Sequence, residues 1–278
     1  MPDWAGRYID TSTRYPESGE VRTYDLAVRL EPGMSRHPAH PPYSFVLNKT
    51  HGQFPYPNGI NAVSEMITMG GHAGTHVDAL GHVSNCGEIH GGGSAVEASD
   101  PRTGLSTASI EEAPPLIGPG HLLDAPTLFG RDLTPADGIG AAELERWFDG
   151  RAAPEPGSML LIRTGWMGRF WDDVDAYIGL ATGLPGLTID GAEWLSERGI
   201  LAAGSDTMNL ERKRTDVTCL DVHVHFLVEN GIYIMEQMSL DTLAADGVTD
   251  FHFFAMPLRI GGGSGSPLRP LAIVGRAA

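Results

Sequence analysis

Three histidines and an aspartate lie within one short run of this chain, His72-Ala-Gly-Thr-His76-Val-Asp78-Ala-Leu-Gly-His82. In an extended strand, the four residues from His72 to His76 would span about 13 Å, which is too far for both imidazoles to reach one ion. In a straight helix the two histidines would be neighbours, but Asp78 would lie on another face. We therefore predict that the chain bends at Gly74 and that His76 and Asp78 share one side of an extended segment. Such a bend would place two imidazoles and a carboxylate around a divalent ion, with positions left for water and substrate.

Composition and charge narrow the classes of partner. The chain has 278 residues, and 19 lysines and arginines stand against 35 aspartates and glutamates, a net charge of −16. A surface this acidic repels phosphate backbones and anionic lipids, so we expect neither nucleic acid nor a membrane as partner. Two cysteines cannot build a disulfide framework, and no run approaches the roughly 18 apolar residues of a membrane helix. With no signal-like N-terminal segment, we expect a cytoplasmic protein of one domain, residues 1–278.

The spacing of apolar and turn residues predicts a mixed α/β chain, richer in strands and loops than in helices. Expected strands cover residues 21–31, 61–70, 121–123, 158–164, 200–203, 232–235 and 270–274. Expected helices cover residues 109–113, 141–148, 188–198 and 222–229, the last closed by Asn230-Gly231. The stretches 35–60 and 84–120 are rich in turn residues and are otherwise expected to be long loops, which in compact domains often carry function.

Other reactive or charged residues form weaker patterns. Cys86 lies near His90, but no third group that would orient a thiol nucleophile is visible, so we do not assign it catalysis. The charged run Glu211-Arg212-Lys213-Arg214 is typical of a solvated loop, with the steering of an anionic substrate as the alternative. Aromatic residues that would either wall a substrate pocket or pack in the core are Phe54, Tyr56, Trp166 and Phe251.

The run from His72 to His82 resembles the signature His-x-Gly-Thr-His-x-Asp-x-Pro-x-His of the cyclase family of metal-dependent hydrolases, which includes kynurenine formamidase and isatin hydrolase. Further stretches resemble the family at residues 23–34, 161–166, 204–211 and 222–236, so the resemblance covers roughly residues 22–275. Leu80 stands where the signature has proline, and extra residues lie around 84–120 and 206–222. These departures indicate another branch of the family and bear on the substrate more than on the reaction.

The resemblance implies a set of site residues. His72, His76 and Asp78 take the places of metal ligands, and His82 takes that of the catalytic histidine. A later His and a Glu complete the site in the family. By their spacing to Gly231, His223 fits the histidine place better than His225, and Glu236 fits the carboxylate. The implied cofactor is a divalent metal, zinc or manganese, as one ion or as two ions that share Asp78. With one ion, Glu236 would orient a ligand or act as a base.

A divalent ion lowers the pKa of a bound water from about 16 toward about 7 and polarises a carbonyl group. We therefore expect a hydrolase that opens an amide, a cyclic amide or a lactone of a small molecule. The alternatives are a metal-dependent lyase, isomerase or cyclase, and a binding protein without catalysis. His82 would act as general base and then general acid, with the orientation of a neighbour as its other reading. The resemblance also implies a β/β/α architecture with mixed barrel-like sheets and flanking helices, and a homodimer or homotetramer.

Overall fold

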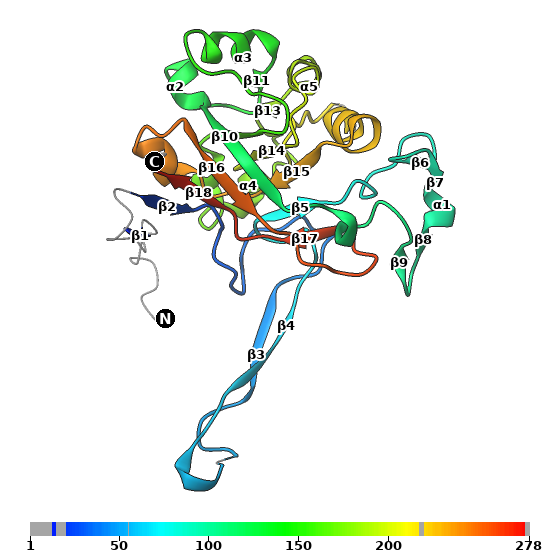
Figure 1. The fold of residues 1–278 in the computed structure, drawn as a ribbon, viewed down its shortest axis with the longest axis vertical. Coiled ribbons are helices and arrows are strands. Elements are labelled where there is room, and N and C mark those ends of the chain that lie inside the picture. The colour runs from blue at the N-terminus through cyan, green and yellow to red at the C-terminus, as the bar shows by residue number, and fades with distance from the viewer. Residues whose placement is uncertain (1–12, 15–20, 55, 217–219, 276–278) are drawn as a thin grey trace.

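A large curled mixed sheet forms the frame of the protein (Figure 1). The computed structural model describes residues 13–14, 21–54, 56–216 and 220–275. Four neighbouring strands in the middle of the sheet, β10, β12, β14 and β15, run parallel, and the strands outside them pair antiparallel. In sheet order the strands are β1 (Thr13–Arg14), β2 (Arg22–Asp25), β18 (Leu271–Val274), β16 (Asp250–Ala255), β10 (Leu116–Asp124), β12 (Met159–Arg163), β14 (Ala202–Ser205), β15 (Tyr233–Glu236), β5 (His76–Asp78) and β17 (Gly265–Pro267).

Both faces of the central strands are buried, as the continuous apolar run at 158–164 predicts. Leu160 and Ile162 of β12 belong to a hydrophobic cluster shared with the large helices, whereas Met159 and Leu161 belong to a second cluster on the opposite face. The alternation follows from the two-residue period of a strand. The expected mixed α/β fold with a barrel-like sheet and flanking helices is therefore confirmed, and its barrel-like part is one continuous sheet.

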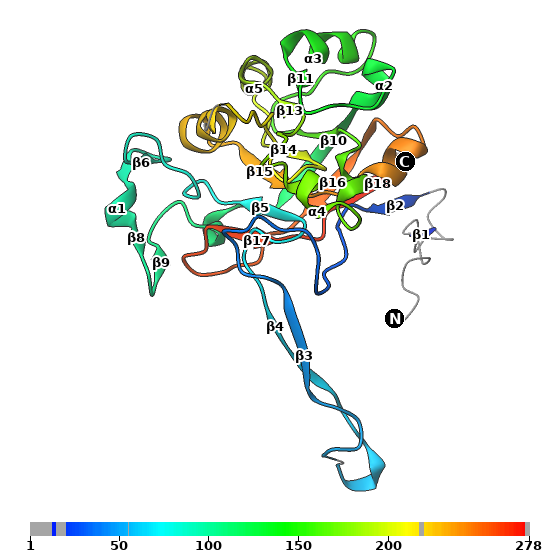
Figure 2. The same cartoon turned by 180° about the vertical axis from the view of Figure 1, so that it is seen from behind.

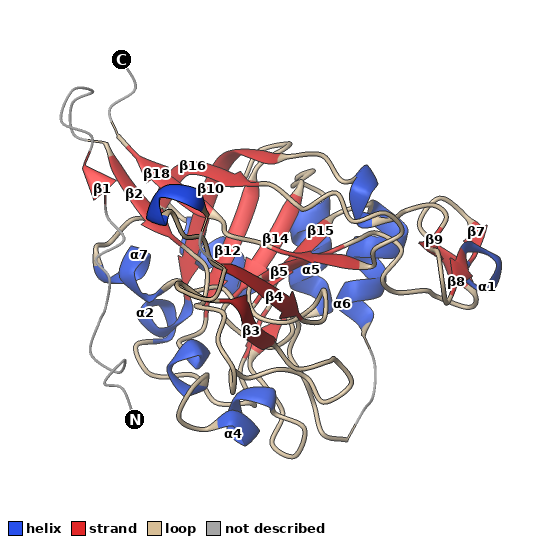
Figure 3. Ribbon diagram, turned by 90° about the horizontal axis from the view of Figure 1, so that it is seen from below, coloured by secondary structure: helices blue, strands red, loops and turns tan. Residues whose placement is uncertain are grey.

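The large helices cover one face of this sheet (Figure 3). The predicted helix at 141–148 is α3 (Ala141–Phe148), and the one at 188–198 is α5 (Ile189–Ser196). The helix predicted at 222–229 begins as α6 (Asp221–His223) and continues as a π-helix (Val224–Asn230), which ends at Gly231 with φ 65°. Shorter elements are α2 (Ala125–Phe129), α4 (Val174–Ile178), α7 (Asp241–Ala245), a 3-10 turn (Trp166–Arg169) and the strand pair β11 (Gly138–Ile139) and β13 (Gly186–Leu187).

Two segments project from the body, and apart from the strand expected at 61–70 they fall in stretches expected to be loops (Figures 1 and 2). The prediction of a loop over 35–60 is wrong at β3 (Ser44–Lys49), which pairs with β4 (Ser64–Thr68) in a long hairpin whose tip carries a 3-10 turn (Pro57–Gly59). Both strands are largely exposed; β4 lies within the strand expected at 61–70, whereas no alternation of buried and exposed residues marks β3 in the sequence. The second segment holds β6 (Glu88–Ile89), β7 (Gly93–Ser94), α1 (Ala95–Ala98), β8 (Ser99–Asp100) and β9 (Gly104–Leu105). After it, the helix predicted at 109–113 is a 3-10 turn (Ile110–Glu112).

Other strand predictions hold with changed bounds. The strand expected at 21–31 is limited to β2, and the one expected at 121–123 is the middle of the longer β10. Strand β16 was not predicted. Its Phe251 packs so closely on Gly120 of β10 that a β-carbon at Gly120 would lie 2.3 Å from the ring. Within the described part of the chain, no helix has the length and apolarity needed to cross a membrane.

Candidate metal centre

The predicted bend at Gly74 is present and leads directly into β5. Gly74 has φ +67°, and a β-carbon there would lie 2.6 Å from the Leu30 side chain, so the turn requires glycine. The hydroxyl of Thr75 fixes the start of the strand, because it donates to the carbonyl of Gln237 at 2.6 Å and accepts from the amide of Val28 at 2.9 Å. The segment that follows is held in place on two sides, between β15 and β17.

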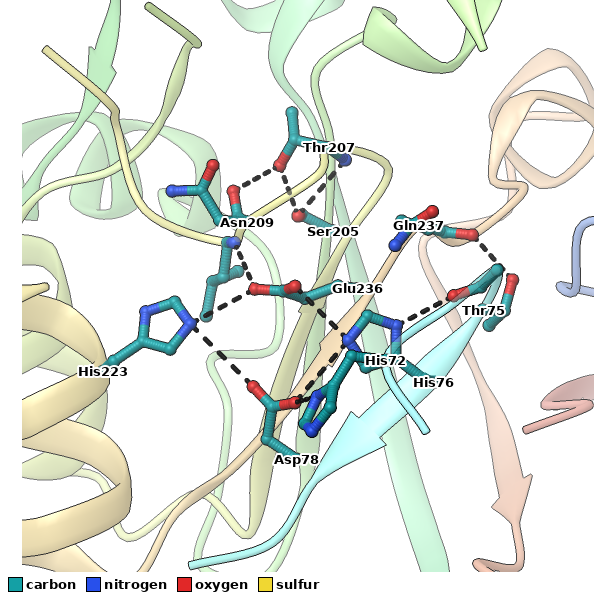
Figure 4. A network of polar contacts seen from close by, with 12 residues as sticks. His72, Thr75, His76, Asp78, Ser205, Thr207, Asn209, His223, Glu236 and Gln237 are labelled. Carbon is teal, nitrogen blue, oxygen red and sulfur yellow. Dashed lines mark hydrogen bonds and ion pairs between the residues drawn. The ribbon is translucent and has the colours of Figure 1, made fainter. Parts of the chain in front are cut away.

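The register of β5 on β15 brings three buried side chains onto one face. His76 lies directly opposite Glu236, and Asp78 shares the face of His76 because side chains two apart in a strand point the same way. The Nδ1–H of His76 donates to the carbonyl of Gly74 at 2.8 Å, which leaves Nε2 turned toward the carboxylates. Figure 4 shows these side chains with the ring of His223 on the other side of the two carboxylates.

Each of the two carboxylates turns one oxygen toward His76 and the other toward His223. The Nε2 of His76 lies 3.5 Å from Oδ1 of Asp78 and 3.4 Å from Oε2 of Glu236. The Nε2 of His223 lies 3.8 Å from Oδ2 of Asp78 and 3.3 Å from Oε1 of Glu236. Two donors that each lie about 2.1 Å from one ion at a tetrahedral angle are about 3.4 Å apart. These separations are therefore close to those of donors around a shared ion, on both sides of the carboxylate pair.

His72 and His82 lie on the His76 side of the cluster. His72 donates from Nδ1 to Oδ1 of Asp78 at 2.7 Å, and its Nε2 lies 3.0 Å from the hydroxyl of Ser264. The ring of His82 stacks on that of His72, with the centroids 4.0 Å apart. Two triplets thus have donor atoms within 4.8 Å of one another, His72 with Asp78 and His82, and His76 with Asp78 and Glu236. The structure brings together all six residues that the sequence analysis singled out for the site.

His223 is oriented by a residue that the sequence analysis did not assign. Its Nδ1–H donates to Oε1 of Glu211, whose other oxygen accepts from the amide of Val222 at 3.2 Å. Glu211 is buried, so the interpretation of run 211–214 as a solvated loop is wrong at its first residue. Of the two candidate histidines, His223 lies at the carboxylates. His225 points elsewhere, with Ser196 2.8 Å from its Nε2 and Glu229 near its Nδ1.

The electrostatics of the cluster favour a positive charge between the carboxylates. Neither Asp78 nor Glu236 has a lysine or arginine ion-pair partner among the described residues. Burial raises the pKa of Asp78, but the surrounding imidazoles of His82, His72 and His76 outweigh it and hold that pKa well below its usual range. Burial likewise raises the pKa of Glu236, and hydrogen bonds from His223 and His76 hold it below the usual value.

The imidazoles respond in two ways. Burial lowers the pKa of His76 and of His223, yet the carboxylates around them outweigh burial and raise both above the ordinary value. His82 has the opposite balance. Burial together with the neighbouring His72 outweighs the attraction of Asp78, and the pKa of His82 falls to about 4. The carboxylates therefore favour positive charge on His76 and His223, whereas burial favours the neutral form of His82.

A cavity of about 490 Å³ opens onto the cluster. The three basic residues of run 211–214 line it, Arg212 and Lys213 half-buried and Arg214 exposed. Of the two alternatives for the aromatic residues, packing in the core holds for Trp166 and Phe251, whereas Phe54 and Tyr56 are exposed on the projecting hairpin. None of these four residues lines the cavity.

Cys86 and His90, which lie near each other in the sequence, have separate surroundings. Cys86 is exposed, and the Nδ1–H of His90 donates to the carbonyl of Val228 at 2.9 Å rather than pairing with the thiol. Cys219 lies outside the described residues.

Comparison with known proteins decides the family. A family profile described as "Putative cyclase" matches residues 24–212, more than half of the chain. The chain belongs to the cyclase family. The expected family membership is confirmed, and the profile match includes the run from His72 to His82.

Curated relatives of this cyclase-family chain include kynurenine formamidases. The kynurenine formamidase of Bacillus thuringiensis (strain Al Hakam) is 27% identical over 245 residues, which cover 88% of this chain and 94% of that protein. The kynurenine formamidase of Bacillus mycoides (strain KBAB4) is 30% identical over 203 residues, 73% of this chain and 76% of that protein. The relatives named for their reaction are therefore hydrolases of an amide bond.

Solved structures share the fold of this cyclase-family chain. A crystal structure described as a novel cyclase superposes with a TM-score of 0.82 at 27% identity, over 92% of this chain and 87% of that one. Isatin hydrolase A from Ralstonia solanacearum superposes with a TM-score of 0.72 at 24% identity and covers 92% of each chain. At 24% identity, the second likeness shows only that the two chains share the fold.

Proposed function

We propose that this chain is a metal-dependent hydrolase that opens the C–N bond of a small amide or cyclic amide, with lactones as a further substrate class. The observation that carries this proposal is the pair of buried carboxylates, Asp78 and Glu236, that each face His76 with one oxygen and His223 with the other. The names of the kynurenine formamidase relatives support the amide bond as the target.

The donor set fits a divalent ion, because imidazole nitrogens and carboxylate oxygens suit zinc and manganese alike. We assign two positions that share Asp78: His72, His76 and Asp78 would hold one ion, and Asp78, His223 and Glu236 the other. Metal bound here would lower the pKa of a coordinated water and polarise the carbonyl group of the substrate. Metal would compete with protons at His76 and His223, since a ligating imidazole nitrogen must be unprotonated.

We propose His82 as the side chain that moves the proton. It lines the cavity, and its ring is fixed by stacking on His72. A neutral imidazole in this position would accept the proton of the attacking water and return it to the leaving nitrogen. If His82 has this role, His82→Ala retains metal but loses most turnover; if it is a ligand beside His72 and Asp78, the variant loses metal as well.

The reaction is tested with protein loaded with zinc or manganese and a panel of formylkynurenine, isatin and a simple aromatic lactone. Assays run in ¹⁸O-labelled water, because hydrolysis places one solvent oxygen in the product carboxylate. We expect label in the product, loss of turnover in His76→Ala, and retained turnover in the matched control His225→Ala. Product without solvent oxygen would contradict hydrolysis and favour a lyase or isomerase, and no turnover of the panel would contradict the proposed substrates.

We also propose that the protein forms a homodimer or homotetramer in which a second copy of the chain covers the hairpin of β3 and β4. An isolated two-stranded hairpin is marginally stable in water, and a large exposed apolar surface marks an interface. The strands also continue at their base into the cavity wall, which His40 and His72 line. The exposed apolar residues of the hairpin are Phe45, Val46, Leu47, Phe54, Tyr56, Ile60, Val63, Met66 and Ile67.

Light scattering tests the assembly. Phe45 and Ile67 lie opposite each other in the hairpin, so Phe45→Asp with Ile67→Asp places two charges on one side of it. We expect an oligomeric wild type that this double variant dissociates, and a monomeric wild type would contradict the proposal.

We further propose a cytoplasmic location and a single working domain, in keeping with a chain whose two cysteines are too few for a disulfide framework.

A further inference from the structure

Gln237 follows Glu236 at the end of β15 and is held in an unusual backbone conformation. Its φ is +56°, in the left-handed region that residues other than glycine rarely adopt. Two hydrogen bonds fix this backbone. The amide of Gln237 donates to the carbonyl of Thr207 at 3.0 Å, and the carbonyl of Gln237 accepts from the hydroxyl of Thr75 at 2.6 Å. Backbone strain that the surroundings enforce is found preferentially at ligand-binding and catalytic sites.

The side chain of Gln237 is fully buried and has no hydrogen-bond partner among the described residues, at either its Oε1 or its Nε2. Burial of an unpaired donor and acceptor destabilises a fold, and most buried polar groups in native proteins are paired. Gln237 also lines the cavity that opens onto the cluster. Among the described buried side-chain atoms without a partner, only those of Gln237 and Arg212 belong to residues that line this cavity.

A free carboxamide presents one acceptor and one donor side by side. The partner that satisfies both atoms at once has an N–H and a C=O on the same side, as in a cyclic amide, where the ring forces the cis arrangement. A lactone lacks the N–H, and an open-chain trans amide turns its N–H and C=O in opposite directions. Figure 4 shows Gln237 between Glu236 and Thr75, on the edge of the cluster.

We propose that Gln237 is the specificity-determining residue of the cavity and that its carboxamide binds the cis N–H and C=O of a cyclic amide substrate. This inference rests on the proposed function and deepens it, because it selects cyclic amides over lactones and open-chain amides. A site built to hydrogen-bond a substrate group discriminates strongly against the analogue that lacks this group, since its own polar atoms then stay unpaired.

The test pairs a protein variant with a substrate variant. Gln237→Leu keeps the size and the unbranched β-carbon of the side chain but removes both polar atoms, and Asn85→Leu, which removes an exposed carboxamide outside the hairpin and the cavity, is the control. Isatin presents the cis N–H and C=O, and N-methylisatin lacks the N–H. In metal-loaded wild type we expect isatin to have about tenfold or more higher kcat/KM, carried mainly by KM, and in Gln237→Leu we expect this preference to disappear. Metal content should be equal in all three proteins. An equal preference in wild type and Gln237→Leu overturns the inference.

Thermal unfolding without substrate gives an independent readout. Because the carboxamide has no partner, Gln237→Leu should unfold at the same temperature as wild type or above it. A fall of several degrees, with Asn85→Leu unchanged, would show that the carboxamide is paired within the fold and would overturn the inference whatever the activity. If wild type hydrolyses formylkynurenine but neither binds nor hydrolyses the two isatins, the inference fails while the proposed function stands. If wild type hydrolyses nothing, the proposed function fails, and the unfolding temperature still decides whether the carboxamide is free.

Discussion

Glu211 offers a perturbation outside the set of proposed ligands that should still weaken metal binding. Its carboxylate accepts from Nδ1 of His223 and from the amide of Val222, and thereby fixes the ring and turns Nε2 toward Asp78 and Glu236. Glu211→Gln keeps the shape but removes the charge, and an amide cannot accept from both donors, because one of its two ends is itself a donor. The variant therefore loses one hydrogen bond and the charge that increases the basicity of His223.

The expected magnitude follows from the role of such partners in metal sites. Loss of a carboxylate that orients a ligating histidine costs about 10–100-fold in metal affinity, which corresponds to about 1.4–2.7 kcal/mol at 1.36 kcal/mol per tenfold. Glu211 is buried, with a side chain only 6% exposed, so solvent screens the interaction little and we expect the upper half of this range. Glu229, which faces His225 with a side chain 51% exposed, provides the matched control.

Competition with a chromophoric chelator at pH 7.5 measures the zinc dissociation constant of wild type, Glu211→Gln and Glu229→Gln. We expect a shift for Glu211→Gln in the stated range and a change of less than about twofold for Glu229→Gln, because an exposed ion pair contributes little. Circular dichroism of each metal-free protein controls for folding. Equal affinity in all three proteins, with the Glu211 variant folded, would refute the reasoning that His223 is a ligand held by Glu211.

Two further changes test other parts of the structure. Gly265→Ala would place a β-carbon 2.5 Å from the ring of His72, so we expect the ring to shift and kcat/KM to fall by up to about 100-fold. An unchanged kcat/KM would contradict this expectation. Burial, partly opposed by hydrogen bonds from Thr164 and Gly165, raises the pKa of Asp206 to about 6, above the unfolded value of about 3.9. The stability that the protonated group contributes is therefore present at pH 4 and lost as the pH rises through 6. Between these pH values, the free energy of unfolding of the metal-free protein, measured in urea, should fall by roughly 2–3 kcal/mol more in wild type than in Asp206→Asn. An equal loss in both proteins would show that Asp206 does not titrate in this range.

Elements with a buried face could be predicted from the sequence. The helix at Ala141–Phe148 and the strand at Met159–Arg163 follow directly from their apolar patterns, because packing on the sheet selects those patterns. Strand β4 falls in the stretch 61–70 that the sequence predicts as a strand, but its partner β3 could not be predicted, since both of its faces are exposed and no pattern of burial shaped its residues. Strand β10 was predicted too short for a different reason: it contains Gly118-Pro119-Gly120, residues that normally indicate a turn but here pair with β16.

The candidate site shows the same division. The turn at Gly74 could be inferred from its glycine and the flanking histidines, since only a bend lets their side chains meet. Glu211 could not be found in the same way, because three basic residues follow it and the run resembles a solvated surface. Its burial depends on long-range backbone pairing, in which Leu187 accepts from Arg212 and donates to Leu210. The position of Glu211 relative to His223 is thus a property of the fold rather than of any local pattern.

The central claim is that Asp78 and Glu236 hold metal between His76 and His223. The most direct measurement is an anomalous difference map from a crystal soaked in zinc or manganese and recorded at the absorption edge of that metal. The account predicts a peak about 2.0–2.2 Å from donor atoms of this cluster, with Asp78 among the ligands. A map with no peak in the cluster, or with its strongest peak elsewhere while these four side chains keep their positions, would contradict the account.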